Sequence, residues 1–238
     1  MSIPLSFKSG SLLDTIFMAL EDFTSYTEVD TNNRLTIISS RVAWAALGDD
    51  ETAYLYKDKG ANFFDGNFTH LLTMQIATGS DSSTWKGTWL LANVVDDLFQ
   101  LESDAENLLT ILLETSGGGN PYIRLYEQAA GGGYFSSQYT LSFDTPYYLK
   151  VVRDEAVGTN GTLYLYMYSD ADRATLLDTL ELTLNAKNDF RYIYAINSRN
   201  DGSAQEQTGF VENLEIGEIK GSPIMAQRMY RHIERMER

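Results

Sequence analysis

The sequence predicts an all-β protein built as an antiparallel sandwich of two sheets, with a short N-terminal arm and one C-terminal helix. Short runs rich in Tyr, Val, Ile, Leu and Thr recur along the chain, and Asp, Asn, Gly and Ser stand between them. In the run at residues 161–170, three apolar side chains alternate with Tyr164, Tyr166 and Tyr168. A period of two places successive side chains on opposite faces of a strand. The glycine-rich joints are too short for parallel crossovers, which favours antiparallel hairpins.

Strand-like runs follow one another along the body of the chain, and each is bounded by turn-forming residues. They cover residues 24–30, 34–40, 41–47, 52–58, 69–78, 84–94, 108–115, 122–128, 134–141, 145–155, 161–170, 174–184, 189–198 and 209–219. Residues 96–107 interrupt the pattern and are predicted to form one helical turn and a loop. The run at 108–115, LLTILLET, is apolar at nearly every position, which indicates a strand buried on both faces.

The domain organisation follows from this pattern. A chain of 238 residues is within the size of a single β-sandwich, and no linker divides the body. We therefore predict an N-terminal arm at residues 1–20, a sandwich at 21–220 and an amphipathic helix at 221–238.

Composition limits the partners. The formal net charge is −15, with 33 acidic and 18 basic residues, and the body has no basic stripe, so nucleic acid is not expected as a partner. The absence of cysteine excludes disulfides and thiolate metal sites. No apolar run is long enough to span a membrane, and the first residues lack the pattern of a secretory signal.

The C-terminal segment has the sequence of an amphipathic helix. Ser222 suits the N-cap and Pro223 the first helical position. An apolar stripe at steps of three and four residues is the candidate surface for docking on a partner. Its residues are Met225, Met229, Ile233 and Met236. A short helix is marginal alone in water, so we expect it to dock on the acidic body or on a partner subunit, in preference to a membrane surface.

Three carboxylates, Glu102, Asp104 and Glu106, would share one face of a strand, which is the arrangement that glucanase catalysis needs. Ser103 and Ala105 stand between them where a catalytic strand needs bulky apolar side chains for the core. A solvated loop is therefore the preferred interpretation, and no catalytic residue is assigned.

No metal site is predicted. The acidic turn at Asp170 and Asp172 could offer oxygen ligands to calcium, but its spacing fits no EF-hand loop. His70 and His232 lie far apart in the sequence. Neither has neighbours at the spacing of metal ligands or of a catalytic triad. We expect no cofactor, with calcium possible but unsupported by a motif.

Aromatic side chains at alternating strand positions are the candidate ligand-binding set. Rings on a sheet can stack on sugar faces, and large rings also suit pleated surfaces for packing alone. The candidates are Tyr164, Tyr166, Tyr168, Tyr192, Tyr194 and Trp89.

Several phrases of the body carry a family resemblance. They are EDFTSYTEVD, YKDKGANFFDGNFTH, YYLKVVRDEAVGTNGTLYLYMYSD and FRYIYAINSRNDGSAQEQTGFVENLEIG. With them the chain resembles the concanavalin A-like lectin/glucanase (LamG-type) jelly-roll domains of phage and metagenome proteins. The resemblance implies a binding or structural jelly roll, similar to modules displayed on virions. The catalytic carboxylate strand of the enzymes and the metal-holding cluster of legume-type lectins are not found in the sequence.

The leading hypothesis is a non-enzymatic phage virion surface protein, a capsid decoration or tail-associated protein anchored by its terminal segments. Its partners would be other virion proteins or further copies of itself, with surface glycans as possible ligands. The alternatives are a carbohydrate-binding module of a microbial cell surface and, third, a glucanase-like hydrolase. The virion surface is the expected location, and an extracellular or cell-surface location is the alternative.

Overall fold

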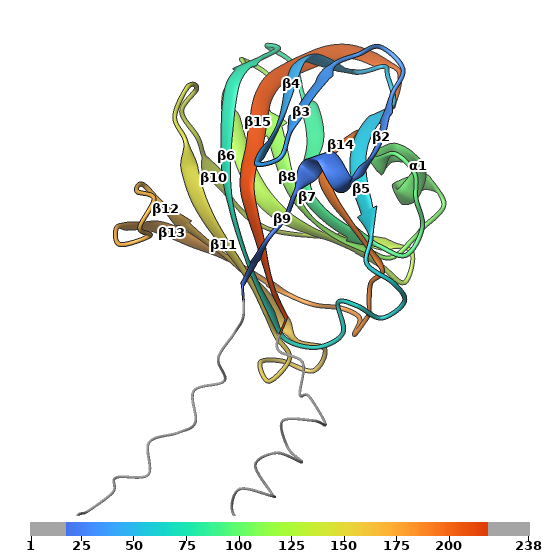
Figure 1. Cartoon of the computed structure of the whole chain (residues 1–238), viewed down its shortest axis with the longest axis vertical. Helices are drawn as coiled ribbons and strands as arrows, with labels where there is room; N and C mark the ends of the chain where they lie inside the picture. The colour runs from blue at the N-terminus through green and yellow to red at the C-terminus, as the bar shows by residue number, and fades with distance from the viewer. Residues whose placement is uncertain (1–17, 219–238) are drawn as a thin grey trace, which may run out of the picture.

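The structure, a computed structural model, describes residues 18–218, which form two antiparallel β-sheets packed against each other (Figure 1). This confirms the predicted all-β fold class. The docking residues proposed in the C-terminal helix, Met225, Met229, Ile233 and Met236, lie outside the described residues, as does most of the predicted arm. The end of that arm belongs to the sandwich, because Ala19–Leu20 pairs with the last strand.

Sheet A has the strand order β13-β12-β11-β6-β15-β4-β3, with the short β1 paired to β15. Its strands are β1 (Ala19–Leu20), β3 (Leu35–Ile38), β4 (Arg41–Asp49), β6 (Phe68–Gly79), β11 (Tyr147–Asp154), β12 (Thr162–Tyr168), β13 (Leu176–Thr183) and β15 (Ser203–Glu218).

Sheet B has the strand order β10-β9-β8-β7-β14-β5-β2. Its strands are β2 (Thr27–Asp30), β5 (Ala53–Asp58), β7 (Thr84–Ala92), β8 (Leu108–Thr115), β9 (Pro121–Ala129), β10 (Gly132–Thr140) and β14 (Tyr192–Ser198). The helices are the 3-10 turn η1 (Phe23–Ser25) and α1 (Leu98–Ser103). The predicted helical turn within residues 96–107 is therefore confirmed, and β9 with β10 forms the predicted hairpin.

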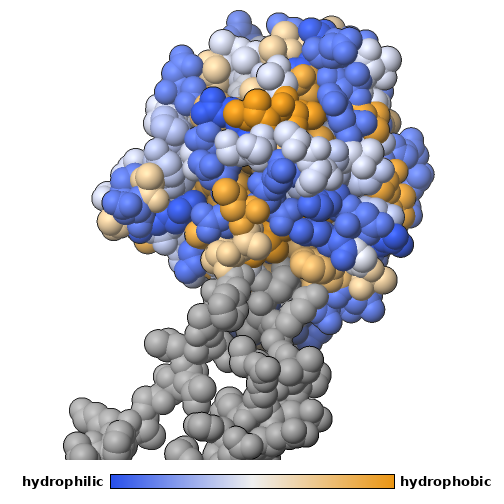
Figure 2. Space-filling view, in the orientation of Figure 1, coloured by the Kyte–Doolittle hydropathy of each residue, from blue (hydrophilic) through white to orange (hydrophobic). Residues whose placement is uncertain are grey.

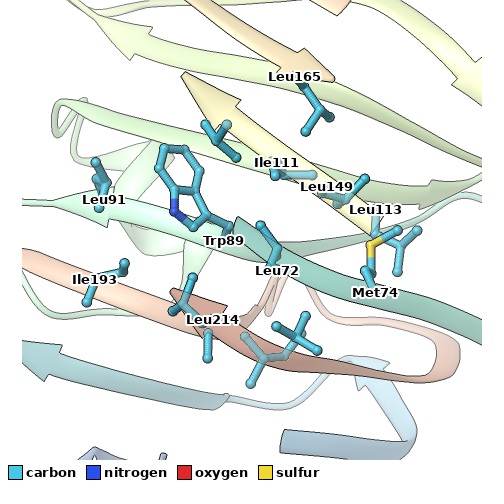
Figure 3. Close-up of a cluster of buried hydrophobic side chains, with 14 of the residues drawn as sticks. Leu72, Met74, Trp89, Leu91, Ile111, Leu113, Leu149, Leu165, Ile193 and Leu214 are labelled. Carbon is cyan, nitrogen blue, oxygen red and sulfur yellow. The ribbon is translucent and has the colours of Figure 1, made fainter. Parts of the chain in front are cut away.

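The main core lies between the two sheets. Leu149 of β11 and Leu165 of β12 meet Trp89, Ile111 and other side chains from sheet B (Figure 3). Because strands alternate, the side chains between these core residues point to the outer face of their sheet. Leu163, Leu165 and Met167 belong to this core, as the alternation in residues 161–170 predicts.

A second apolar layer covers the outer face of sheet B. Leu98 and Leu101 of α1 pack there against Leu90, Leu108 and neighbouring side chains. This layer helps to explain why every residue of β8 is buried: Leu109, Ile111 and Leu113 face the main core, whereas Leu108 and Leu112 belong to the outer layer. The burial predicted for LLTILLET is confirmed. In Figure 1, α1 lies beside β5 and β14.

The ends of the described chain meet at one end of the sandwich. Ala19 pairs with Ile216 of β15, so β1 and the last residues of β15 lie side by side (Figure 1). The 16 residues of β15 run from there to Ser203, which pairs with Asp49 at the opposite end. We call the end with β1 the terminal end and the end with Asp49 and Ser203 the far end.

Among residues 18–218, neither helix has the length and apolar character that crossing a bilayer requires.

Candidate functional site

The most developed cluster of chemistry-bearing side chains lies on the outer face of sheet B toward the far end. We call it the Trp85 cluster. It consists of Trp85 of β7, Phe99 and Glu102 of α1, Glu114 of β8, Arg124 of β9, Phe135 of β10, and Arg199 and Asp201, which follow β14. Phe99 and Phe135 are exposed to 38% and 41%, which is unusual for phenylalanine in a folded domain.

The centre of the cluster is the indole of Trp85, which lies between two arginines. The guanidinium carbon of Arg199 is 4.8 Å from the ring centroid, and that of Arg124 is 5.3 Å from it. Each guanidinium also lies over a phenylalanine: Arg124 is 3.9 Å from the centroid of Phe135 and Arg199 is 5.2 Å from that of Phe99. Rings and cations thus alternate, and cation–π attraction holds the planes in place.

Carboxylates hold the two arginines. Glu114 is fully buried and accepts hydrogen bonds from Nε and Nη2 of Arg124, the latter over 2.9 Å. Its Oε2 also accepts the hydroxyl of Tyr122 over 2.6 Å. Arg199 donates from Nε to Glu102 over 2.9 Å and pairs with Asp201 through Nη1. Charge-assisted bonds of this kind fix a side chain more strongly than neutral ones.

The same burial shifts the acid–base properties of the cluster. Burial raises the pKa of Glu114, although the bonds from Tyr122 and Arg124 oppose that shift. Burial, followed by the hydrogen bond and charge of Glu114, raises the pKa of Tyr122 to about 12. Burial also raises the pKa of Tyr126, and the charge of nearby Glu102 adds to the effect. Both tyrosines therefore stay neutral at ordinary pH.

Helix α1 is positioned by local capping and by one strand residue. Asp97 is the N-cap, and its carboxylate accepts the amide of Gln100 over 3.1 Å. Asn197 of β14 accepts the amide of Leu98 over 3.0 Å and donates to the carbonyl of Asp96 over 3.0 Å. These bonds satisfy amides at the start of the helix, so Phe99 and Glu102 are held over the sheet.

Beneath Trp85 lies a buried ion pair. The ammonium of Lys86 contacts the carboxylate of Asp49 and donates to the carbonyl of Gly48 over 3.0 Å. The other oxygen of Asp49 accepts the backbone amide of Trp85 over 3.1 Å. Burial lowers the pKa of Lys86, and the charge of Asp201 opposes that shift. The pair ties β7 to the loop end of β4, and so supports the Trp85 cluster from inside.

The six residues predicted to bind a ligand are distributed over three places. Trp89 is fully buried in the main core, where Figure 3 shows it among Leu72, Leu91 and Ile111. No ligand can stack on it there, so its assignment was wrong. The cause is a β-bulge between Gly87 and Trp89. One extra residue reverses the facing of the strand beyond it, so Trp85 points outward and Trp89 inward.

Tyr192 and Tyr194 lie on the outer face of sheet B, in a cluster of rings with Tyr54 and Tyr56. Tyr194 is fully buried, donates to the carbonyl of Val94 over 3.1 Å, and has a pKa that burial raises. It packs the sandwich and offers no surface. Tyr192 is half-buried beside Tyr56.

Tyr164, Tyr166 and Tyr168 lie together and half-exposed on the outer face of sheet A. They are on the opposite side of the molecule from the Trp85 cluster and from Tyr192. The predicted set therefore does not form one surface.

The remaining acidic and histidine candidates have local roles. Asp170 accepts the backbone amides of Ala174 and Thr175 over 3.0 and 2.7 Å, which is ordinary turn chemistry. His70 is buried and accepts a hydrogen bond from Trp89. Across residues 18–218, no three His, Asp or Glu side chains come together as metal ligands would. The expectation that the protein uses no cofactor stays a prediction.

Sequence reasoning missed Arg124, Arg199, Glu114 and Phe135. The sequence gives one indication of this site, the run at residues 84–94 with its two tryptophans. The bulge between Gly87 and Trp89 cannot be seen in the sequence, so the run does not show that Trp85 is the exposed ring. Arg199 follows β14 and has no local motif, so only the pairing of β14 with β7 brings it to Trp85.

Comparison with known proteins identifies the fold. The exoplasmic/lumenal domain of VIP36, in a form bound to Ca²⁺ and Man3GlcNAc, aligns with a TM-score of 0.56 and 12% identity over 88% of this chain and 92% of that one. The alginate lyase Aly36B aligns with a TM-score of 0.50 and 12% identity over 84% and 88% of the two chains.

A GH43 protein from Bacillus licheniformis aligns with a TM-score of 0.50 and 11% identity over 84% of this chain but 39% of that one. No protein-family model and no curated protein matches the sequence. At these identities the likeness concerns the fold alone: the chain has a jelly-roll sandwich fold, as do these neighbours. Fold alone does not decide between binding and catalysis.

Proposed function

We propose that the protein is a non-enzymatic carbohydrate-binding module and that the Trp85 cluster is its binding surface. The observation that carries the proposal is the arrangement of Trp85, Phe99 and Phe135 around two fixed guanidinium groups at the surface. Aromatic faces pack against the C–H faces of sugars, while guanidinium N–H groups and carboxylate oxygens pair with hydroxyls.

The charges of the cluster favour a neutral glycan. Arg124 and Arg199 are already paired with Glu102, Glu114 and Asp201, which leaves one negative charge in excess. The whole chain has a net charge of −15 and repels polyanions at long range. Hydroxyl groups suit such a surface because they both donate and accept hydrogen bonds.

The absence of catalysis is part of the proposal. A nucleophile or general base needs an oxygen that can reach the substrate. Both oxygens of Glu114 are occupied by Arg124 and Tyr122, and Glu102 is paired with Arg199. These carboxylates are suited to holding arginines. A glucanase-like hydrolase that uses Glu102 is the alternative.

The position of the cluster suits display. It lies toward the far end, whereas β1 and the end of β15 meet at the terminal end. A module attached at its terminal end would present the cluster outward. Attachment to a phage virion, as a capsid decoration or tail-associated protein, stays our prediction from the sequence. Deletion of residues 223–238, and separately of 1–20, should reduce incorporation into particles, and unchanged incorporation would contradict the anchoring role.

Glycan-array binding of the full chain, followed by calorimetry with the best neutral oligosaccharide, tests the proposed function. Trp85→Thr should weaken binding at least tenfold, which corresponds to about 1.4 kcal/mol. Threonine keeps a residue suited to a strand while it removes the ring. Phe143→Ala, an exposed phenylalanine outside the cluster, is the matched control and should bind as the wild type. Equal binding by Trp85→Thr and wild type would refute the site.

A further inference from the structure

A second aromatic surface lies on the outer face of sheet A, on the side away from the Trp85 cluster. Tyr164, Tyr166 and Tyr168 occupy alternate positions of β12, and Tyr148 of β11 pairs directly with Tyr168. The side chains between them, such as Leu165, are buried in the core, which fixes the direction of the tyrosines. We call these four residues the tyrosine platform.

The rings of the platform are pre-arranged. Tyr164 and Tyr166 are nearly parallel, with centroids 6.0 Å apart and an interplanar angle of 26°. The ammonium of Lys150 is 5.6 Å from the centroid of Tyr166. Because each ring is held on a paired strand, a ligand that stacks here meets a surface that loses little conformational freedom on binding.

The third feature of the platform is its hydroxyl groups, which make no hydrogen bond to the described part of the chain. Within residues 18–218, no hydrogen-bond partner is found for the hydroxyl of Tyr148, Tyr164, Tyr166 or Tyr168. By contrast, Tyr194, Tyr126 and Tyr122 each use their hydroxyl inside the protein. Half-exposed rings with uncommitted hydroxyls offer both a stacking face and hydrogen bonds.

Polar and charged groups border the rings. Arg173, from the turn after β12, donates to the carbonyls of Leu149 and Leu72 over 3.3 and 3.4 Å, and it interacts electrostatically with Tyr148 and Tyr168. Glu181 of β13 lies directly opposite Tyr164 of β12 in the sheet. More generally, hydrophilic residues lie between the apolar patches on the face of the molecule that Figure 2 shows. A mixed surface of this kind differs from the apolar centre of a stable protein interface.

We propose that the tyrosine platform is a second glycan-binding surface, which takes a neutral polysaccharide independently of the Trp85 cluster. Charge argues against two other occupants, a second copy of this chain and a polyanion. The chain has a net charge of −15, so it repels both a second copy and a polyanion. With one binding surface on each sheet, a single copy would bridge two polysaccharide chains, and its avidity for an insoluble polymer would exceed that of either surface.

The test uses four forms of the full chain: wild type, Trp85→Thr, Tyr166→Thr and the double variant. Threonine suits a strand position, so removal of the ring leaves the fold in place, and circular dichroism checks each form. Insoluble mannan, chitin and β-glucan are the probes in sedimentation assays. Tyr134→Thr, which changes an exposed tyrosine of β10 outside the platform, is the matched control.

We expect Trp85→Thr to retain measurable binding to at least one polymer. The double variant should bind that polymer at least about tenfold more weakly than Trp85→Thr does, a change of about 1.4 kcal/mol. Wild type should also cross-link soluble mannan or β-glucan into a turbid suspension, and neither single variant should. Complete loss of binding in Trp85→Thr, or unchanged binding in Tyr166→Thr, overturns the second surface. A wild-type dimer that Tyr166→Thr converts to a monomer also overturns it, because the platform is then a contact between copies.

Failure of the two proposals is distinguishable. If Trp85→Thr binds as wild type while Tyr166→Thr loses binding, the Trp85 cluster is refuted and the tyrosine platform stands. The reverse result refutes the platform alone.

Discussion

The indole nitrogen of Trp89 donates a hydrogen bond to Nδ1 of His70 over 3.0 Å in the centre of the sandwich. Trp89 comes from sheet B and His70 from sheet A, so the bond joins the two sheets through their common core. Phe68 stacks on His70 with ring centroids 4.5 Å apart, and Phe64 and Trp89 approach it edge-on. A tryptophan placed in this way is a structural residue.

Trp89→Ala should therefore lower stability and have no specific effect on binding. Loss of a fully buried tryptophan leaves a cavity and costs about 3–5 kcal/mol. Urea unfolding, followed by circular dichroism, measures the loss. Trp85→Ala is the matched tryptophan control at the surface and should cost clearly less. A loss below about 1 kcal/mol for Trp89→Ala would contradict its place in the core.

Removal of the Lys86 ammonium should destabilise the protein strongly. Lys86 and Asp49 are both buried, and a buried pair that loses one partner leaves an uncompensated charge, at a cost of about 3–5 kcal/mol. Lys86→Met should therefore unfold at much lower urea than wild type.

The double variant Lys86→Met/Asp49→Leu is the control for this pair. It removes both charges and should recover part of the loss, so that a double-mutant cycle gives a coupling energy above about 1 kcal/mol. Additive effects of the two substitutions would show that the charges do not interact.

Alkaline pH should reveal the raised pKa of Tyr122. In the folded protein this pKa is about 12, whereas an unfolded tyrosine ionises near about 10. Between these values the folded state binds the proton and the unfolded state does not, so the free energy of unfolding falls as pH rises. Tyr122→Phe removes this contribution and should make the fall shallower. Urea unfolding at several pH values in this window measures it, and equal slopes would contradict the prediction.

Substitution of Glu102 separates binding from hydrolysis. Glu102→Gln removes the charge that holds Arg199, so binding to the best neutral oligosaccharide should weaken severalfold as Arg199 becomes less fixed. Wild type should release no reducing sugar from β-glucan. Release by wild type that Glu102→Gln abolishes would favour the hydrolase over the binding module.

Much of the fold could be predicted from local pattern. The alternation in residues 161–170 predicts both a strand and the side that Leu165 faces, because the period of two belongs to the strand itself. The apolar run of β8 likewise indicates burial on both faces before its covering layer, α1, is known. The break in the strand pattern at residues 96–107 likewise predicts the place of the short helix α1.

The candidate site could not be predicted in the same way. Regular alternation along β7 would place Trp85 and Trp89 on the same face of the sheet. The order of apolar and polar residues does not reveal the bulge that puts them on opposite faces. Tyr166 and Tyr192 also share one pattern, yet β12 and β14 belong to different sheets.

The β class, the order of the strands along the chain and, in a regular strand such as residues 161–170, the residues that face alike could all be predicted from the sequence, since these depend on neighbours along the chain. Only the tertiary structure decided which strands share a sheet, which side of a bulge a ring occupies, and that Arg199 lies over Trp85. Those outcomes depend on pairing between segments far apart in sequence, and the free energy of that pairing comes from burial shared by the whole sandwich.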